Sequence, residues 1–202
     1  MNYHLNLPIS NNELNLDSIG HLTKSILIDG AQINSSNLIG NLTSVLFDAE
    51  DLDIISGSPS IRRKYIDILI SQLNKKYLTT LQNYQKILTQ RNNLLKLIRK
   101  GDASINELYF WNKELIEKGT YIIEERNSTI NLLNKLSVPI HKNLSNDQEN
   151  LEITYMPNVP KIIETESITE IFENQLITKE KDEILQGITI VGPHRDDIKI
   201  SI

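Results

Sequence analysis

The chain has 202 residues, enough for one ordinary domain or two small ones, and 39% of them are apolar. It contains no cysteine, which excludes disulfide bonds, thiol catalysis and cysteine-held metals. No apolar run approaches the roughly 20 residues of a membrane helix, and the N-terminus lacks a basic-then-apolar signal pattern. The simplest expectation is a cytoplasmic protein without a membrane partner.

Charge is distributed unevenly along the chain. The formal net charge is −5, yet residues 58–101 carry ten bases and one acid, so this segment has a net charge of +9 and the rest −14. A basic segment on an otherwise acidic chain is a local feature that selects partners, nucleic acids among them. The alternative is that the basic segment pairs with the acidic one that follows it.

Short apolar and alternating runs in residues 1–47 predict strands joined by turns. The clearest of these is a hairpin that turns at Asp29-Gly30. A long helix is predicted next, from Ser58 to Ile98. Ser58 suits the N-cap, proline follows it, and apolar residues recur every three or four positions until Gly101.

A second long helix is predicted to begin at Ser104, because Ser104 and Glu107 have the spacing of a capping box, and to stop at Pro139. The short turn 100–103 makes the two helices an antiparallel hairpin. Gly119 lies on the apolar stripe, which indicates a close approach of the two helix backbones there.

Each helix also carries one arginine on its apolar stripe, Arg91 and Arg126. Each is expected to extend past the apolar seam or to pair with a nearby acid, with a ligand-binding role as the alternative. The lysines of the first helix pose a similar choice. Exposure on one solvent face favours DNA, whereas pairing with the glutamates of the second helix favours a purely structural arm.

The remainder reads as a mixed α/β segment. A polar connector, 141–150, precedes a strand at 151–155, and a short helix is predicted at about 168–176. Two further strands are predicted, at 188–191 and 198–202, around a tight polar turn.

That turn, GPHRDD at 192–197, concentrates ionisable groups between two apolar runs. Three functional interpretations are a metal site, a kinase-like loop and a phosphate-adjacent loop that orders a site built elsewhere. Adjacent residues on a strand point to opposite faces, which disfavours the metal, and the kinase loop lacks its asparagine. The structural alternative is a turn in which Arg195 pairs with Asp196 or Asp197. The sequence also lacks any phosphate-binding loop or G-x-S-x-G, so no catalytic residue and no metal ligand is predicted.

Several stretches, in this order, resemble the RecF family of bacterial recombination mediators, which is related to the SMC-type ABC ATPases. They are EDLDIISGSPSIRRKYID at 50–67, YQKILTQRNNLL at 84–95, WNKEL at 111–115 and GPHRDD at 192–197. Two positions depart from the family pattern: Ala49 stands where proline is usual, and Asn112 where aspartate is usual. The resemblance extends from about residue 24 to the C-terminus.

The resemblance implies an α+β fold: a long antiparallel helical hairpin, the arm domain, flanked by β-rich fragments of an ABC-type ATPase head. The expected divisions are 1–57 for a head fragment, 58–150 for the arm and 151–202 for the return to the head. The family's phosphate-binding loop, ABC signature and Walker B carboxylate would lie outside these residues. We therefore expect a central fragment that neither binds nor hydrolyses ATP alone, although ATP and Mg are cofactors of the full-length family.

The implied role of the parent protein is ATP-dependent binding of single-stranded or gapped DNA in replication, recombinational repair and the SOS response. The implied partners are this DNA, recombination mediator proteins of the same pathway and a second copy in an ATP-dependent homodimer. The alternative is a structural or protein-interaction arm with no DNA affinity of its own.

The resemblance and the residues together suggest two sites. Arg62, Arg63 and Lys64 follow the Ser58-capped helix start and form a predicted DNA phosphate site, with an internal clamp between arm and head as the alternative. A further internal possibility is a pair between Arg63 and Asp67, four residues apart. The second site is expected to order the ATP-dependent interface and consists of His194, Arg195, Asp196 and Asp197.

Overall fold

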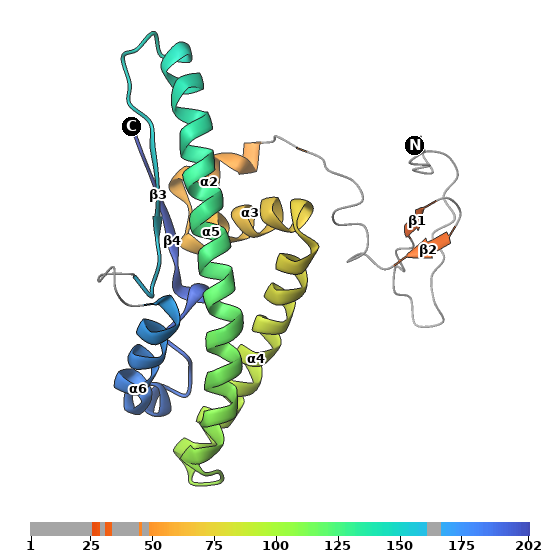
Figure 1. Ribbon diagram of the computed structural model, residues 1–202, viewed down its shortest axis with the longest axis vertical. Coiled ribbons are helices and arrows are strands. Elements are labelled where there is room, and N and C mark those ends of the chain that lie inside the picture. Colours follow the sequence, from red (N-terminus) through yellow and green to blue (C-terminus); the bar gives the residue numbers. More distant parts are fainter. Residues whose placement is uncertain (1–25, 29–30, 34–44, 46–48, 161–166) are drawn as a thin grey trace. The chain divides into compact units, whose positions relative to one another are not determined.

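A computed structural model of the chain describes residues 26–28, 31–33, 45, 49–160 and 167–202 (Figure 1). The chain forms two compact units, residues 1–44 and residues 45–202. Within the described ranges, no helix is both long enough and apolar enough to cross a membrane.

The described part of the first unit is a β-hairpin. Strand β1 (Ile26–Ile28) pairs antiparallel with β2 (Ala31–Ile33), and Ile28 lies opposite Ala31. This register confirms the predicted antiparallel pairing, and the predicted turn residues, Asp29-Gly30, lie outside the described residues. The other strands predicted in 1–47 lie outside the described residues.

The second unit opens with a short 3₁₀ turn, η1 (Ala49–Leu52), and the short helix α2 (Asp53–Ser56), followed by α3 (Pro59–Leu73). Ser58 precedes α3 with extended backbone, and proline occupies the first turn, as predicted.

The single helix predicted from residue 58 to 98 is wrong, because the chain breaks at Asn74 and begins again as α4 (Lys75–Lys100). Asn74 has extended backbone (φ −136°, ψ 100°), and its side-chain oxygen accepts a hydrogen bond from the Tyr77 N–H. Asparagine is among the best N-cap residues, so this side chain starts a new helix where the apolar spacing alone predicts continuity.

Helix α4 ends at Gly101, whose left-handed backbone (φ 84°) is the conformation that favours glycine. The predicted capping box is present around η2 (Ile105–Glu107), and α5 (Leu108–Leu144) runs back along α4 (Figure 1). The antiparallel helical hairpin is therefore confirmed. Its second helix is longer than predicted.

Pro139 does not stop α5, and the first residues of the predicted polar connector belong to the helix. A proline removes the hydrogen bond to the carbonyl four residues earlier, here that of Lys135. Both Pro139 and Lys135 are exposed, so this carbonyl can be hydrated and the helix continues to Leu144.

After α5 the chain forms strand β3 (Glu152–Met156), helix α6 (Ile168–Gln186), the 3₁₀ turn η3 (Pro193–Arg195) and strand β4 (Asp197–Ser201). β3 and β4 pair antiparallel, with Tyr155 opposite Ile198. The short helix predicted at 168–176 is more than twice as long, and residues 188–191 form no strand. The α+β class is confirmed, although helices dominate the described part after residue 151.

The main core extends over α3, α4, α5 and α6 and the β3–β4 pair, and α6 packs across the α4–α5 hairpin. Gly119 of α5 sits at this crossing: a Cβ there would lie 2.5 Å from Phe172 of α6 and 3.2 Å from Tyr84 of α4. The predicted close approach of the two helix backbones is not what Gly119 provides: the nearest atoms are side-chain atoms of Phe172 and Tyr84, and the space left by the missing Cβ holds the Phe172 ring of a third helix.

Candidate functional site

The start of α3 and the 192–197 loop, 135 residues apart in sequence, meet through ion pairs. Arg62 donates two hydrogen bonds to the Asp197 carboxylate, Nε to Oδ1 at 2.7 Å and Nη2 to Oδ2 at 3.0 Å, and a third to the Gly57 carbonyl at 2.8 Å. Arg63 donates from Nη1 to the Asp196 carbonyl at 2.6 Å. A two-pronged guanidinium–carboxylate contact fixes orientation as well as distance.

Arg126 of α5 makes the second connection between the arm and the loop. It donates Nε and Nη2 to Asp67 of α3, at 3.0 and 2.9 Å. Its Nη1 reaches the Asp196 carboxylate at 3.0 Å and the Pro193 carbonyl at 2.7 Å. A single buried guanidinium therefore joins α3, α5 and the loop.

Two tyrosines complete the hydrogen bonding of these carboxylates. The Tyr77 hydroxyl donates to Asp67 at 2.5 Å, and the Tyr155 hydroxyl donates to Asp196. The Asn158 N–H occupies the other Asp196 oxygen at 2.7 Å. We call Arg62, Arg63, Asp67, Arg126, Asp196 and Asp197 the junction cluster.

Electrostatic effects act in both directions within the junction cluster, because burial lowers the pKa of Arg63 and raises that of Asp196. The hydrogen bonds from Arg62 lower the pKa of Asp197 below its usual value. Burial is the largest single influence on Arg126 and lowers its pKa, but Asp67, Tyr77, Tyr155 and Asp196 together outweigh burial and raise that pKa. Arg126 is 3% exposed and Asp196 is 1% exposed, so their charges depend on each other rather than on water.

His194 lies inside the fold and is held neutral. Its Nε2 lies 3.0 Å from the Thr189 carbonyl, which can only accept, so Nε2 carries the proton. Its Nδ1 then accepts from the Tyr84 hydroxyl at 2.7 Å. Burial raises the pKa of Tyr84, which keeps that donor protonated, and burial lowers the pKa of His194 to about 4.

A second buried cluster surrounds the other stripe arginine, Arg91, which is 0% exposed. It donates to Glu183 of α6 at 2.6 Å, to Asn112 of α5 at 2.8 Å and to the Thr189 hydroxyl at 2.7 Å. The other Glu183 oxygen accepts from the Ile190 N–H at 2.8 Å. Arg91 thus holds α4, α5, α6 and the segment before the 192–197 loop together.

The contacts in these two clusters can be compared with the ion pairs expected from the sequence. Arg91 and Arg126 do pair with acids, as expected. The acid expected for Arg63, Asp67, pairs with Arg126 instead. Arg195, expected to pair with its two neighbouring aspartates, is exposed and contacts only the Thr189 carbonyl, at 3.3 Å.

The hydrogen bonds of the junction cluster tie the 192–197 loop to α3 and α5. Every junction carboxylate accepts from an arginine, and His194 has both ring nitrogens occupied. Within the part of the chain that the structure describes, no group of three or more His, Asp or Glu residues could hold a metal ion.

The exposed charge lies elsewhere, along α4, a helix with no acidic residue. Lys75 and Lys86 are separated by eleven residues, about three helical turns, and lie on the side opposite the buried Tyr84 and Arg91. Lys76 lies over the ring of Tyr121, 4.4 Å from its centroid. Among the described residues, the α4 lysines form no ion pair with the α5 glutamates. Lys64 of α3 is exposed as well.

No protein-family profile matches the chain. The curated DNA replication and repair protein RecF of Lachnoclostridium phytofermentans is 40% identical over 204 residues, covering 98% of this chain and 54% of the relative. RecF of Roseiflexus castenholzii is 35% identical over 186 residues, covering 89% and 47%. The chain thus spans about half the length of these curated relatives.

Two solved structures of the recombination mediator protein RecF in the RecFOR pathway, RecF-ATP and RecF-ATPrS, are also similar. Each is 34% identical, and the match covers 89% of this chain and 48% of the solved one, with TM-scores of 0.81 and 0.80. The fold is therefore that of an α+β fragment of an ABC-type ATPase. Over most of its length the chain is therefore similar to RecF proteins, at 34–40% identity.

Proposed function

We propose that this chain serves as the arm-bearing part of a RecF-type protein that binds single-stranded or gapped DNA in an ATP-dependent manner. The setting would be DNA replication, recombinational repair and the SOS response in the cytoplasm. The observation that carries this proposal is the 40% identity over 98% of the chain to a DNA replication and repair protein.

The proposed role of the junction cluster is to couple the helical arm to the 192–197 loop. Arg62 and Arg63 were predicted as phosphate ligands, but their donors already serve Asp197 and the Asp196 carbonyl. We therefore assign Arg62 and Arg63 mainly to the clamp, and the DNA contact to the exposed Lys64 and the solvent face of α4. DNA contact by the two arginines stays a prediction that mutation can separate from clamping.

ATP and Mg would be held by other residues of a RecF-type protein. The 202 residues contain no glycine-rich phosphate loop, and the ionisable groups of the 192–197 loop are taken up by internal partners, apart from the exposed Arg195. The loop is thus suited to ordering an ATP-dependent interface, including that of a homodimer, without contacting the reacting phosphates. Mediator proteins of the same pathway would be its protein partners.

The test is binding of the folded chain to fluorescein-labelled gapped duplex, single-stranded and intact duplex DNA by anisotropy, from 50 to 200 mM salt. If four lysines contact duplex phosphates, the logarithm of the binding constant falls with the logarithm of salt with a slope of about −3.6. Tighter binding to the gapped or single-stranded DNA than to the intact duplex is the expected result.

A second candidate function is a structural or protein-interaction arm without DNA affinity. It is favoured by the engagement of Arg62, Arg63, Arg91 and Arg126 in internal contacts, which removes much of the basic charge from the surface. A chain that is helical by circular dichroism but shows no DNA binding at 50 mM salt would establish this alternative and overturn the proposal.

A further inference from the structure

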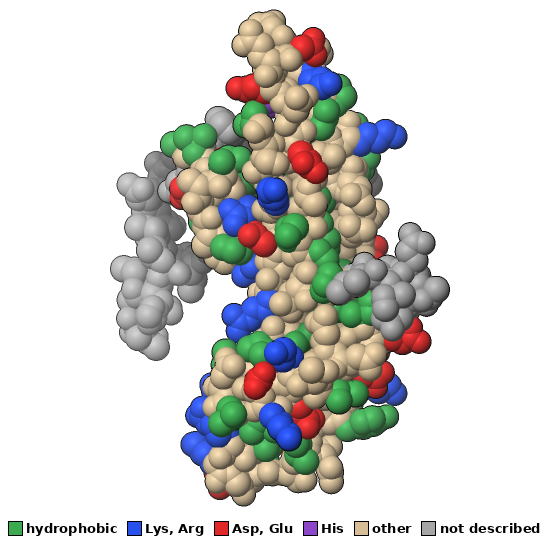
Figure 2. All heavy atoms as spheres, turned by 90° about the vertical axis from the view of Figure 1, so that its left-hand side faces the viewer, with side chains coloured by type: hydrophobic (Ala, Val, Ile, Leu, Met, Phe, Trp, Pro, Cys, Tyr) green, Lys and Arg blue, Asp and Glu red, His purple; other side chains and the backbone are tan. Residues whose placement is uncertain are grey.

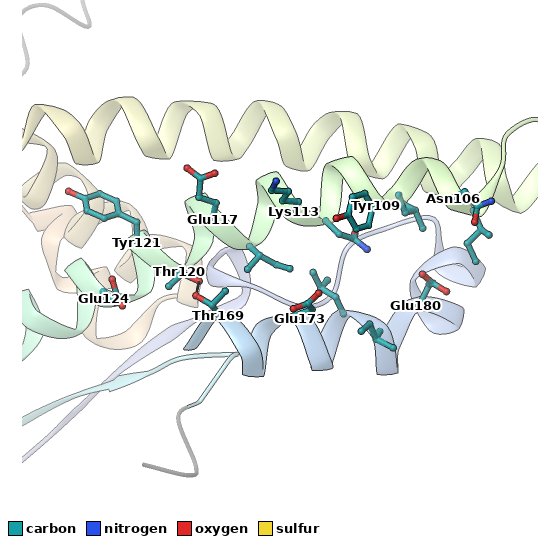
Figure 3. A pocket seen from close by; sticks show the side chains of 16 residues that line it. Asn106, Tyr109, Lys113, Glu117, Thr120, Tyr121, Glu124, Thr169, Glu173 and Glu180 are labelled. Carbon is teal, nitrogen blue, oxygen red and sulfur yellow. Dashed lines mark hydrogen bonds between the residues drawn. The ribbon is translucent and has the colours of Figure 1, made fainter. Parts of the chain in front are cut away.

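A groove of about 1090 Å³ runs between α5 and α6, and none of its lining residues belongs to the junction cluster (Figure 3). Its floor is apolar and buried, formed by Leu108, Ile116 and Leu176, which are 1, 7 and 1% exposed. Its walls carry two large side chains that remain open to solvent, Tyr109 at 76% and Ile177 at 65%. Exposed apolar side chains in a groove indicate a binding surface.

Acidic side chains flank this apolar floor on both helices. Glu117 and Glu124 lie one heptad apart on α5, and Glu173 and Glu180 lie one heptad apart on α6 (Figure 3). Lys113 is the single base in the lining. Of the four glutamates, Glu117 alone has an ion-pair partner among the described residues, the neighbouring Lys118.

Figure 2 shows green hydrophobic side chains among red acidic and blue basic ones over the lower part of the molecule, around α6. An acidic rim repels the phosphates of DNA and attracts cations. The groove therefore selects a different partner from the lysine face of α4.

The shape of the groove favours a helix as its occupant. The lining residues on α5 extend from Leu108 to Glu124, about 24 Å of helix axis at 1.5 Å per residue, or about four and a half turns. The groove is formed by two helices and offers no strand edge, so an added β-strand would leave its backbone groups unpaired. A helix pairs its own backbone and presents an apolar stripe every three to four residues.

We propose that this groove binds an amphipathic helix of a partner protein. That helix carries Lys or Arg on both sides of an apolar stripe. The groove is lined by Tyr109, Ile116, Leu176 and Ile177, with the acids Glu173 and Glu180 beside them. The apolar floor supplies the burial, and the glutamates fix orientation by facing the basic flanks. This inference stands on the groove itself and does not depend on DNA binding.

The probe is a fluorescein-labelled synthetic helix of about 18 residues, the length of the groove, with leucines at helical spacing flanked by lysines. It is titrated with the folded full chain and measured by anisotropy. A control peptide replaces the leucines with serine and keeps the charge. The chain is compared with the double variant Glu173→Lys/Glu180→Lys and with Glu149→Lys/Asp182→Lys, which makes the same change in net charge outside the groove.

We expect the leucine peptide to bind the parent chain. Its affinity should fall by about tenfold or more in the groove variant and by less than about twofold in the control variant. Equal losses in both variants, equal binding of the serine peptide, or no binding would overturn the proposal. Sedimentation of the chain alone is a further measurement. If the chain self-associates and Glu173→Lys/Glu180→Lys abolishes that self-association, the groove binds a second copy and the proposal is overturned as well.

Discussion

Replacing Arg126 by methionine should strongly destabilise the second unit. The methionine fills much of the same space but removes all donors to Asp67, Asp196 and the Pro193 carbonyl. Two carboxylates then lose the cation that donates hydrogen bonds to both of them, and Asp196 is 1% exposed. Breaking such a buried pair from one side costs about 3–5 kcal/mol. Because Asp67 is partly solvated, with a side chain 16% exposed, we expect the lower half of that range.

The assay is urea unfolding followed by circular dichroism, with Arg99→Met as the matched control. Arg99 is exposed and reaches only two carbonyls, at 3.3 and 3.4 Å, so its replacement should change the free energy of unfolding by less than about 0.5 kcal/mol. With a urea slope of about 2 kcal/mol per M, the Arg126 variant should unfold at a midpoint lower by about 1.5–2 M. If Arg126→Met lowers the free energy of unfolding by less than about 1 kcal/mol with an unchanged urea slope, Arg126 does not neutralise the cluster.

Three further perturbations test other parts of the structure. Gly119→Ala places a methyl 2.5 Å from the Phe172 ring and should lower the free energy of unfolding by about 1–3 kcal/mol, despite alanine's better helix propensity. An unchanged midpoint of thermal unfolding would show that α6 shifts freely. Burial lowers the pKa of His194 to about 4 in the folded chain, so as the pH falls below about 6.5 the unfolded chain takes up a proton before the folded chain does. The free energy of unfolding should therefore fall between pH 6.5 and pH 4, by up to roughly 1.4 kcal/mol per pH unit. His194→Gln should remove that part of the slope, and an equal pH dependence in both proteins would contradict it. A double-mutant cycle of Arg62→Ala and Asp197→Ala should give a coupling of about 0.5–1 kcal/mol, because Asp197 is 38% exposed; additive losses would contradict the clamp.

The helical arm could be predicted from sequence because its signals are local. The Gly101 end and the Ser104 capping box depend on residues within one turn of each other. The break at Asn74 escaped prediction because a single extended residue barely disturbs an apolar spacing of three or four. The available signal was the asparagine itself, followed by a new basic turn.

The junction cluster could not be predicted in detail because its partners are far apart in sequence. Arg126 and Asp196 are 70 residues apart, and neither tyrosine of the cluster is marked by any local pattern. Reasoning from neighbours assigned Arg63 to Asp67 and Arg195 to the adjacent aspartates, whereas the fold supplies arginines from other elements. An arginine on an apolar stripe was nevertheless a correct signal, because a buried guanidinium requires a buried acid.

The most direct test of the clamp is the salt dependence of gapped-DNA binding in two variants whose helix content matches the parent. The account predicts that Lys64→Ala/Lys75→Ala/Lys86→Ala reduces the magnitude of the slope by about three, one for each lysine that no longer neutralises a phosphate. It predicts that Arg62→Ala/Arg63→Ala leaves the slope unchanged, because those side chains serve Asp197 and the Asp196 carbonyl. A folded arginine variant whose slope falls by about two, with the lysine variant unaffected, would contradict the clamp and place the DNA on the arginines.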